Sequence, residues 1–316
     1  MKALYYDGGK AKLKEDYPVP VPLAHESLIK ISLAAICNTD REIMHGYKPD
    51  FAGVLGHEFV GVVESSNDPK LVGRRVVGEL NEGCGECVYC KTGREHHCVY
   101  RKCIGITGKD GCFAPYMTIA TRLLHIVPDE LPDERAVFTE PLAAALEIAE
   151  QVHIKPSTEV CVIGDGRLAF MTAQVLALTG APVTVLGRHE EKLEMFKPFA
   201  NTITETRQSF EIVVDACGSP SGIETAMRHV RSKGTIVMKS TYAKGRELNL
   251  SLLVVNEVKL IGSRCGPFEP ALSLLERALI DLPPIELFKL EDWEAAFASK
   301  AFKAGFDFRE KILQKY

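Results

Sequence analysis

From about residue 157 the chain alternates short apolar runs with helical stretches, and this alternation constrains the fold more than any other sequence feature. The apolar runs are uninterrupted, as expected for strands buried on both faces. We therefore expect a doubly wound α/β domain, a parallel sheet with helices on both sides. The expected strands are Val160 to Ile163, Val183 to Leu186, Ile212 to Asp215, Thr235 to Met238 and Val258 to Ile261, and the expected helices are Leu168 to Leu178, Glu190 to Phe196 and Gly222 to Val230.

The first 80 residues have a different character, with short β-like runs bounded by proline and glycine. They predict a small, mostly antiparallel domain, and a chain of 316 residues is long enough for two domains. The first convincing helix follows Glu140-Pro141. The expected strands are Leu28 to Ile36, Phe59 to Glu64, Arg75 to Leu80 and Ala114 to Ala120, and the tail adds helices at Pro270 to Ile280 and Glu291 to Ser299 before a final strand.

Composition and charge exclude several classes of function. A formal charge of −4 gives no reason to expect nucleic acid or an anionic membrane as a partner. No apolar run is long enough to span a bilayer, and the N-terminus lacks the features of a signal peptide, so we expect a cytoplasmic protein. Disulfides are rare in that compartment, and metal binding therefore explains clustered cysteines better.

Four of the ten cysteines form such a cluster, Cys84, Cys87, Cys90 and Cys98, in a glycine-rich loop. Four thiolates complete a tetrahedral zinc shell and leave no position for a substrate, so this zinc would be structural. The alternatives are a disulfide pair, an iron–sulfur cluster or free thiols. Cys103 and Cys112 lie outside the spacing and are expected to be ordinary small residues.

A glycine motif lies between the first expected strand and helix of the α/β region, where Gly164, Gly166 and Ala169 follow a G-x-G-x-x-A spacing. Gly164 allows a tight turn, and Gly166 lets the backbone approach a pyrophosphate at the helix N-terminus. Ala169 still permits close packing of the helix on the strand. The motif predicts a dinucleotide site, and the alternative is a plain strand–helix turn.

The end of the second strand bears on the choice of cofactor. NAD sites place an acidic residue about twenty residues after the motif, where it binds the ribose hydroxyls. Here Gly187 is followed by Arg188, with Lys192 one turn further on. With no carboxylate to repel a 2′-phosphate, these residues favour NADP(H), although NAD(H) is not excluded. The alternative is that Arg188 is a solvated loop residue.

A third group of residues has the composition of a catalytic metal site. Cys37 follows one β-like run, and His57 and Glu58 begin another. A thiolate, an imidazole and a carboxylate are the ligand types of a zinc that keeps one position open. A His-Glu pair can also be a polar turn before a strand.

With these motifs in this order, the chain resembles the zinc-dependent medium-chain alcohol and polyol dehydrogenases over nearly its whole length. The resemblance implies a GroES-like catalytic domain (1–150 and 267–316, with a structural-zinc lobe at 81–103) interrupted by a Rossmann domain (151–266). It also implies that Cys37 and His57 bind a catalytic zinc together with an acidic residue. Glu140, in a Glu-Pro-Leu motif, and Glu58 are the two contenders. For Glu140 the alternative is a carboxylate favoured by a helix N-terminus.

The resemblance further assigns a role to Thr39, whose hydroxyl would take the substrate proton. Glu42 stands where many relatives carry a relay histidine; His45 could substitute, although a surface histidine is the simpler interpretation. Asp40 is expected to be a structural hydrogen-bonding residue. Gly218, Ser240 and Arg264 follow later strands of the sheet, at the edge where a dinucleotide lies, or are loop residues.

The chain is shorter than typical relatives and leaves little room for a strand and helix between Phe196 and Ile212, so we expect a trimmed Rossmann sheet. The expected reaction moves a hydride between a small primary or secondary alcohol, or polyol, and NAD(P), in a homodimer or homotetramer. Three alternatives are a regulator of the same fold without catalysis, a zinc-independent reductase of the superfamily and a zinc-ribbon nucleic-acid module. The intact motifs and the negative charge disfavour them.

Overall fold

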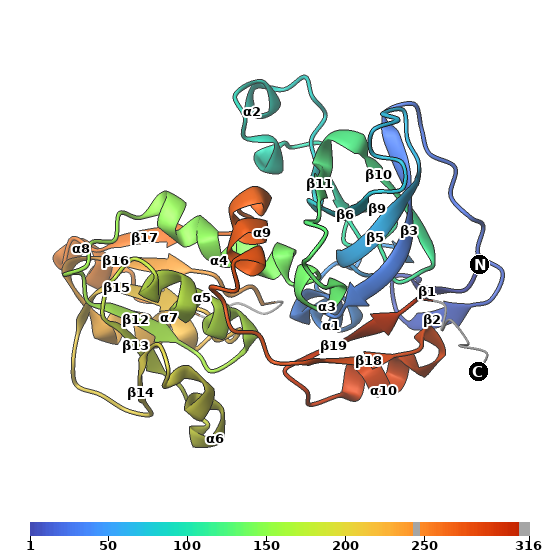
Figure 1. Ribbon diagram of the computed structural model, residues 1–316. Helices are drawn as coiled ribbons and strands as arrows, with labels where there is room; N and C mark the ends of the chain where they lie inside the picture. The colour runs from blue at the N-terminus through green and yellow to red at the C-terminus, as the bar shows by residue number, and fades with distance from the viewer. Residues whose placement is uncertain (243–246, 310–316) are drawn as a thin grey trace. The chain divides into compact units, whose positions relative to one another are not determined.

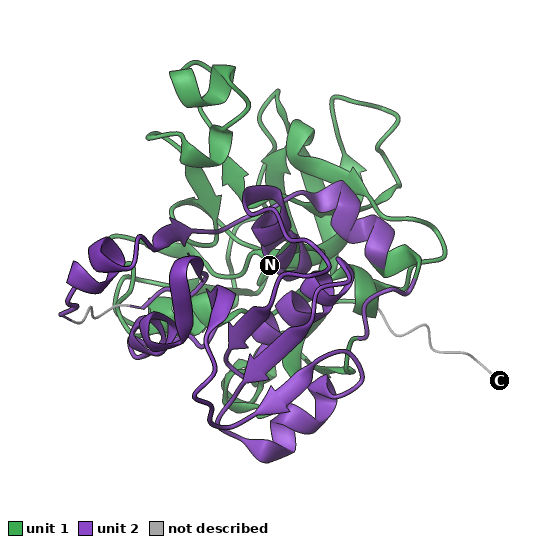
Figure 2. Ribbon diagram, turned by 90° about the vertical axis from the view of Figure 1, so that its left-hand side faces the viewer, with its two compact units in different colours: residues 1–140, 275–277, 282–316 green, residues 141–274, 278–281 purple. Residues whose placement is uncertain are grey.

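The computed structural model describes residues 1–242 and 247–309, which divide into two compact units (Figures 1 and 2). Unit 1 consists of residues 1–140, 275–277 and the chain from 282 onward. Unit 2 consists of residues 141–274 and 278–281. Unit 1 is therefore discontinuous in sequence. The functional boundaries expected above, at 150/151 and 266/267, remain a prediction.

The main sheet of unit 1 is built around β3, the strand that runs through its centre. The strand order is β11-β6-β5-β3-β19-β18, and β10 also pairs with β3. Pairing is antiparallel except between β18 and β19, so the predicted antiparallel domain is confirmed. The strands are β3 (Glu26–Ala35), β5 (Glu58–Ser65), β6 (Arg75–Gly78), β10 (Tyr116–Ala120), β11 (Leu124–Ile126), β18 (Ile285–Phe288) and β19 (Lys303–Asp307).

Shorter elements complete unit 1. The described residues form two further small sheets, of order β2-β1-β4 and β7-β8-β9. Their strands are β1 (Ala3–Tyr6), β2 (Ala11–Lys14), β4 (Gly53–Val54), β7 (Asn81–Glu82), β8 (Lys102–Ile104) and β9 (Gly108–Lys109). The short helices are α1 (Asn38–Met44), α2 (Val88–Lys91), α3 (Asp133–Ala136) and α10 (Trp293–Ala298), with 3₁₀ turns η1 (Glu95–His97), η2 (Thr121–Leu123) and η4 (Leu290–Asp292).

The aromatic core of unit 1 joins distant parts of the sequence. Phe113 packs edge-on against Phe306 of β19, with ring centroids 5.0 Å apart, and against Phe297 of α10 at 6.2 Å. Phe113 and Phe306 are completely buried. Edge-to-face pairs of this kind stabilise a core beyond the area that they bury. α10 and β19 are therefore part of the core of unit 1.

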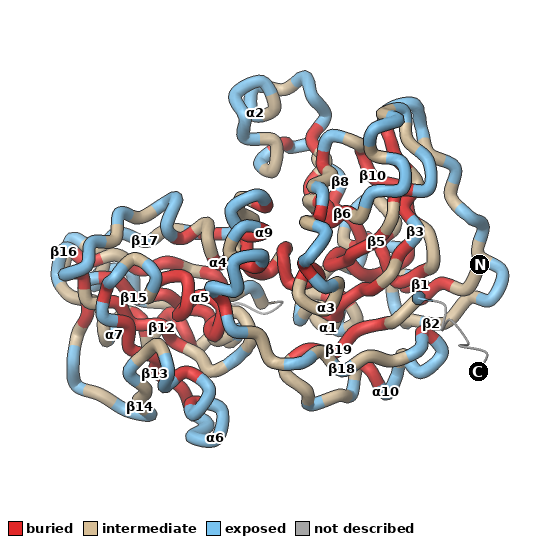
Figure 3. Tube along the Cα trace, in the orientation of Figure 1, coloured by how far each residue is buried: buried red, intermediate tan, exposed pale blue. Residues whose placement is uncertain are grey.

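Unit 2 contains the predicted parallel sheet, in the order β14-β13-β12-β15-β16-β17. Every residue of β12 and β13 is buried, which explains why these strands appear in the sequence as continuous apolar runs (Figure 3). All of the pairings are parallel. The strands are β12 (Val160–Ile163), β13 (Val183–Leu186), β14 (Asn201–Ile203), β15 (Phe210–Asp215), β16 (Val230–Met238) and β17 (Lys259–Gly262).

Helices cover the sheet of unit 2. Ile223 and Ala226 of α7 pack into the core formed by the strands, and Phe170 of α5 packs edge-on against Phe196 and Phe199 at 5.2 Å. The helices are α4 (Thr139–Gln151), α5 (Arg167–Ala177), α6 (Glu190–Leu193), α7 (Gly222–His229), α8 (Ser251–Val255) and α9 (Phe268–Glu276), with the 3₁₀ turn η3 (Glu194–Phe196). α4 and α9 carry residues of both units.

The expected shortening of the α/β domain affects a helix and not a strand. The expectation that both a strand and a helix are lost before Ile212 is wrong for the strand, because β14 pairs with β13 in parallel. The segment from 204 to 209 runs on to β15 without a helix. Three residues are enough for an edge strand, since it needs partners on one side only. None of the helices in the described part of the chain combines the length and the apolar character that crossing a bilayer requires.

Candidate functional site

Cys37, His57 and Glu58 lie together because β3 and β5 are neighbouring antiparallel strands. Their register pairs Ala35 with Glu58, so the end of β3 lies beside the start of β5. Cys37 follows as the N-cap residue of α1, a helix that the sequence did not predict. One ligand atom from each of the three residues lies within 4.8 Å of the others. We call these residues the Cys37 cluster.

Asp40 orients two members of the Cys37 cluster from the first turn of α1. Its Oδ2 accepts a hydrogen bond of 2.8 Å from the backbone N–H of Cys37, and its Oδ1 lies 3.3 Å from Nδ1 of His57. Burial by itself lowers the pKa of His57, but the Asp40 carboxylate and the Cys37 side chain raise it well above the ordinary value. With Nδ1 facing Asp40, the ring leaves Nε2 for a metal ion.

Glu58 has a buried cationic partner, Lys303 of β19, which the sequence did not reveal. The two side chains form an ion pair and are only 1% and 3% exposed. A buried charge of either sign is costly unless it is paired. The Glu58 carboxylate is therefore shared between Lys303 and the other two members of the Cys37 cluster.

The Cys37 cluster fits a zinc ion in its donor types and in its spacing. Thiolate, imidazole and carboxylate donors are those of catalytic zinc sites. His57 and Glu58 are buried, so an ion there would be shielded from bulk water. Glu140 is half-buried in the first turn of α4 and is not among the donors that gather in this cluster within the described residues. The structure therefore brings three of the four predicted ligands together.

The predicted proton-accepting hydroxyl lies beside the cluster. Oγ1 of Thr39 is 3.6 Å from Sγ of Cys37, one residue inside α1. His45, the C-cap residue of the same helix, is exposed, and Glu42 is half-buried. The first turn of α1 therefore holds Thr39 and Asp40 beside Cys37, and His45 caps the other end of the helix.

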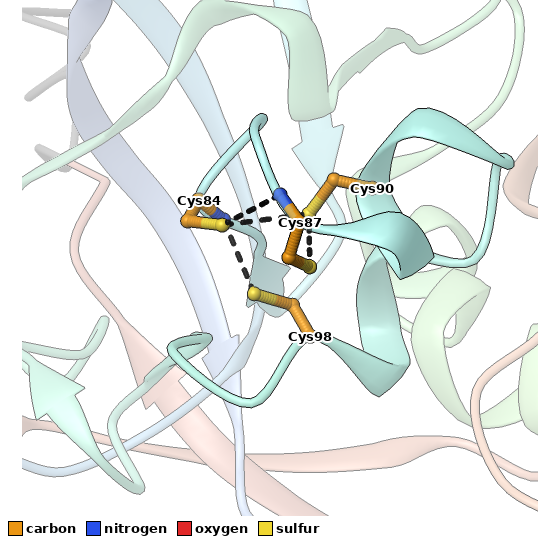
Figure 4. A group of neighbouring side chains, drawn as sticks. All are labelled: Cys84, Cys87, Cys90 and Cys98. Atoms are coloured by element: carbon orange, nitrogen blue, oxygen red, sulfur yellow. Dashed lines mark hydrogen bonds between the residues drawn. The ribbon is translucent and has the colours of Figure 1, made fainter.

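The four predicted structural ligands also gather in one place. The sulfurs of Cys84, Cys87, Cys90 and Cys98 face one another (Figure 4), and all lie within 4.8 Å of each other. The Sγ atoms of Cys87 and Cys90 are 3.6 Å apart, and those of Cys84 and Cys90 are 4.0 Å apart. Metal–sulfur bonds of about 2.3 Å in a tetrahedron give sulfur–sulfur edges of about 3.8 Å. These residues, the four-cysteine cluster, therefore fit one zinc ion.

Backbone N–H groups donate to sulfurs of the four-cysteine cluster and favour the thiolate form of Cys84, whereas burial raises the pKa of Cys90. N–H groups of Cys84 and Tyr100 each lie 3.4 Å from Sγ of Cys98, and the N–H of Cys87 lies 3.4 Å from Sγ of Cys84. Backbone hydrogen bonds lower the pKa of Cys84 to about 6. None of the cysteines in the described residues forms a disulfide. Cys103 donates to Oδ1 of Asn81 at 3.1 Å, away from the cluster.

The turn with the glycine motif, residues 164–166, joins β12 to α5 as predicted. We call it the dinucleotide loop. Gly164 has a φ of +123°, and a Cβ there would lie 2.9 Å from the carbonyl oxygen of Ala216. Gly166 is the N-cap residue of α5, and a Cβ on it would meet nothing within 4 Å. Ala169 is completely buried. Gly164 is thus required by the turn, and Gly166 leaves open space where a phosphate group would lie.

A carboxylate lies at the end of β13, although the sequence places glycine there. It belongs to Asp165, in the middle of the dinucleotide loop. Its Oδ2 accepts hydrogen bonds from the backbone N–H groups of Arg188 and His189, at 2.7 and 3.0 Å, and lies 2.9 Å from Nδ1 of His189. The premise of the NADP(H) prediction, that no carboxylate occupies this corner, is therefore wrong.

The remaining predicted cofactor residues lie at the carboxyl edge of the sheet or just beyond it. Nη2 of Arg188 donates to Oγ of Ser221 at 3.0 Å. The N–H of Gly218 donates to Oγ of Ser240 at 2.9 Å. Lys192 and Arg264 are exposed. Their cofactor contacts remain a prediction.

The sequence did not predict the contacts of two residues near the site, the ion pair of Lys303 with Glu58 and the hydrogen bonds of Asp165 at the end of β13. Nothing near Lys303 in the sequence points to Glu58, because the strands that bring them together are far apart in the chain. Asp165 carried a signal, since an acidic residue is unusual between the two glycines of a phosphate-binding turn.

Comparisons with protein families agree with the fold and with the order of the motifs. Residues 23–129 match the alcohol dehydrogenase GroES-like domain, and residues 168–277 match the zinc-binding dehydrogenase domain. The chain is 30% identical to D-arabitol-phosphate dehydrogenase from Enterococcus avium, covering 89% of this chain and 88% of that protein. It is 26% identical to a sorbitol dehydrogenase from Halalkalibacterium halodurans, covering 92% of both.

Solved structures show the same fold at lower identity. A zinc-binding dehydrogenase from Sinorhizobium meliloti bound to NADP superposes with a TM-score of 0.87 at 23% identity, covering 97% of this chain and 98% of that one. RspB from Escherichia coli CFT073, described as a short chain alcohol dehydrogenase and in complex with NADH, superposes with a TM-score of 0.87 at 24% identity, covering 98% of this chain and 99% of that one. Together with the matched domains, these findings show that the chain belongs to the zinc-dependent medium-chain alcohol and polyol dehydrogenase family and is an NAD(P)-linked oxidoreductase.

Proposed function

We propose that this enzyme reversibly oxidises a primary or secondary alcohol, or a polyol, to a carbonyl compound, with zinc at the Cys37 cluster. The observation that carries the proposal is the gathering of Cys37, His57 and Glu58 with the Thr39 hydroxyl beside them. A polyol is the favoured substrate class, because the relatives described above are sorbitol and arabitol-phosphate dehydrogenases.

Each residue of the site has a chemical task in this proposal. Cys37, His57 and a carboxylate would hold the zinc, which would supply Lewis acidity toward the substrate oxygen, while the nicotinamide would carry the hydride. Asp40 holds the His57 ring so that Nε2 faces the metal position. Oγ1 of Thr39 receives the proton of the substrate hydroxyl and passes it outward.

The third zinc ligand is Glu58 or Glu140. The ion pair with Lys303 competes with a metal ion for the Glu58 carboxylate, which argues against Glu58 as a permanent ligand. Glu140 is the other contender because of its Glu-Pro-Leu motif. Ligation by one carboxylate rather than the other can depend on whether substrate or cofactor is present. A metal–oxygen distance of about 2.0–2.2 Å to one of them identifies the ligand in a given state.

A second zinc, at the four-cysteine cluster, would have a structural role, because four thiolates close its coordination shell. In this proposal, residues 1–150 and 267–316 form the catalytic domain, and residues 151–266 bind the dinucleotide. A homodimer or homotetramer is the expected assembly. Arg188 and Lys192 favour NADP(H), whereas the Asp165 carboxylate at the end of β13 opposes a 2′-phosphate, so the choice between the two dinucleotides stays a prediction.

The decisive test is the variant Cys37→Ser, measured for zinc content and for oxidation of a panel of alcohols and polyols. The wild-type protein is expected to contain two zinc ions per chain, and the variant one. Turnover should be lost, because the metal position loses its thiolate. Binding of the dinucleotide should remain, because the dinucleotide loop lies elsewhere in the sequence.

Cys103→Ser is the matched control. Its hydroxyl can still donate to Asn81, so both zinc ions and full activity are expected. Wild-type activity in Cys37→Ser would refute the mechanism. A single zinc in the wild-type protein, with no turnover of any alcohol, would instead indicate a regulator that keeps only the four-cysteine cluster.

A further inference from the structure

The end of β13 lacks a side chain because another side chain already fills the space. A Cβ on Gly187 would lie 3.0 Å from both Cβ and Oδ2 of Asp165, and 2.7 Å from Cδ2 of Leu193. In dinucleotide-binding folds, this strand end carries the acidic residue that binds the adenosine ribose. Here glycine at 187 makes room for a carboxylate that comes from the glycine-rich turn.

The Asp165 carboxylate is held firmly by one of its oxygens only. Oδ2 takes both backbone hydrogen bonds and the contact with the His189 ring. Oδ1 accepts no hydrogen bond from the residues that the structure describes. The side chain is 12% exposed, so it is neither sealed in the core nor free in solution. Oδ1 of Asp165 is therefore a fixed acceptor at the end of β13 that can still receive a hydrogen bond.

The carboxylate at this corner is in its charged form. Burial raises the pKa of Asp165, but the two backbone N–H groups and His189 outweigh this effect and hold the pKa below its ordinary value. A charged carboxylate accepts hydrogen bonds from hydroxyl groups and repels a phosphate. The same group can therefore favour one dinucleotide and disfavour the other.

We propose that Asp165 replaces the missing strand-end acid: its Oδ1 accepts a hydrogen bond from the 2′-hydroxyl of the adenosine ribose and excludes a 2′-phosphate. The enzyme then prefers NAD(H) to NADP(H), contrary to the expectation from Arg188 and Lys192. This inference rests on nicotinamide-cofactor binding by the family fold and not on zinc or on the identity of the alcohol.

Arg188 does not reverse this preference. Its guanidinium points to Ser221 at the start of α7, where it donates a hydrogen bond of 3.0 Å. Arg188 and Lys192 are both exposed, and solvent and salt screen their charges. The Asp165 carboxylate is more enclosed than either cation and is fixed by its donors, so its repulsion of a 2′-phosphate is screened less.

Direct binding of two fragments tests the proposal without any turnover. ADP-ribose carries the adenosine half of NAD, and 2′-phospho-ADP-ribose carries that of NADP. Calorimetry on the zinc-loaded protein should show that ADP-ribose binds at least tenfold more tightly. In Asp165→Asn, which keeps the size of the side chain and removes its charge, the preference should shrink by tenfold or more, mainly through tighter binding of 2′-phospho-ADP-ribose.

Arg188→Ala separates this proposal from an NADP site. The ratio of the two affinities should stay within about threefold of the wild-type ratio, because Arg188 is not the discriminating group. The proposal is overturned if 2′-phospho-ADP-ribose binds the wild-type protein more tightly, or if Asp165→Asn leaves the ratio unchanged while Arg188→Ala weakens the phosphorylated fragment tenfold. Failure of the wild-type protein to bind either fragment would also overturn it, without bearing on zinc content or the Cys37→Ser result.

Discussion

At the scale of single residues, glycines behind His57 decide whether the Cys37 cluster can form. Gly56 precedes the histidine with a φ of +93°, and a Cβ on it would lie 2.6 Å from Cε1 of Phe113. A Cβ on Gly105 would lie 2.8 Å from the backbone nitrogen of Gly56, and one on Gly111 would lie 2.5 Å from the carbonyl oxygen of Leu55. The backbone behind the site is therefore packed too closely for side chains.

This packing predicts that Gly56→Ala is strongly destabilising. The left-handed backbone costs a non-glycine residue about 1 kcal/mol, and the overlap with the Phe113 ring adds about 2 kcal/mol. Urea denaturation followed by circular dichroism measures the loss. The expected total is about 3 kcal/mol, and the zinc content should fall with it because His57 is displaced.

Gly46→Ala is a matched control that measures only the cost of the left-handed backbone. Gly46 has a φ of +91°, but a Cβ on it would meet nothing within 4 Å. Its substitution should therefore cost only about 1 kcal/mol. Equal losses in the two variants would show that the Phe113 contact contributes nothing and that the backbone conformation alone matters.

The residues of the site could be predicted only where local sequence carries the chemistry. The cysteine spacing, the His57-Glu58 pair and the glycines of the dinucleotide loop are local patterns, and the structure brings each group together. Lys303 and the final place of Asp165 depend on how strands and turns pack, and no local pattern reports that. The NADP(H) expectation illustrates this limit: it stays a prediction, but Gly187 by itself did not reveal that the Asp165 side chain fills the space beside it.

At the scale of elements, the strands of unit 2 were predictable and several short elements were not. β12, β13 and β15 follow the predicted runs, because strands covered on both faces are continuously apolar. β16 and the edge strand β17 also overlap the predicted runs, although β17 is mostly exposed. α1, α8, β14 and β18 are short, and two are half-exposed edge strands without a clear periodicity. Their formation depends on tertiary partners more than on their own residues.

An ion pair between a buried carboxylate and a half-buried ammonium joins two elements of unit 1 and makes its stability depend on pH. Glu26, the first residue of β3, pairs with Lys109 of β9, which also donates to Oγ1 of Thr118 in β10 at 2.8 Å. Burial raises the pKa of Glu26, but the N–H of Leu23 and the Lys109 ammonium lower it below its ordinary value of 4.5. The ion pair therefore stabilises the fold above pH 4.5.

We expect Glu26→Gln to lower stability at neutral pH by about 3 kcal/mol, because Lys109 is left unpaired. The wild-type advantage should be complete above the unfolded pKa and should disappear as the pH falls through the lower folded pKa. Urea midpoints measured from pH 7 downward for both proteins provide the test. Glu64→Gln, at an exposed position of β5, should show no such pH-dependent difference, and a constant gap at all pH values would contradict the linkage.

At the scale of the whole molecule, the predicted metal ligands and the predicted dinucleotide loop belong to different compact units. Both metal clusters lie in unit 1, and the dinucleotide loop with Asp165 lies in unit 2. We therefore expect Cys98→Ser to lose one of two zinc ions per chain and to lower the thermal midpoint, while ADP-ribose affinity stays within about twofold, since none of its proposed ligands is changed. Metal analysis and calorimetry measure the two effects.

The reverse variant completes this test. Asp165→Ala should weaken ADP-ribose and leave both zinc ions in place. Loss of zinc in Asp165→Ala, or loss of ADP-ribose binding in Cys98→Ser, would show that the two functions are coupled through the fold and would contradict their independence.

The ion pair between Glu58 and Lys303 also sets an order of events during synthesis. Unit 2 is complete once residue 281 has left the ribosome, whereas unit 1 still lacks β18 and β19. Until β19 pairs with β3, the Glu58 carboxylate has no cation and Phe113 has no Phe306 to pack against. Residues 1–140 can therefore complete their unit only after unit 2 has been made. A nascent chain that stops short of Lys303 carries the predicted metal ligands without the strand that completes their surroundings.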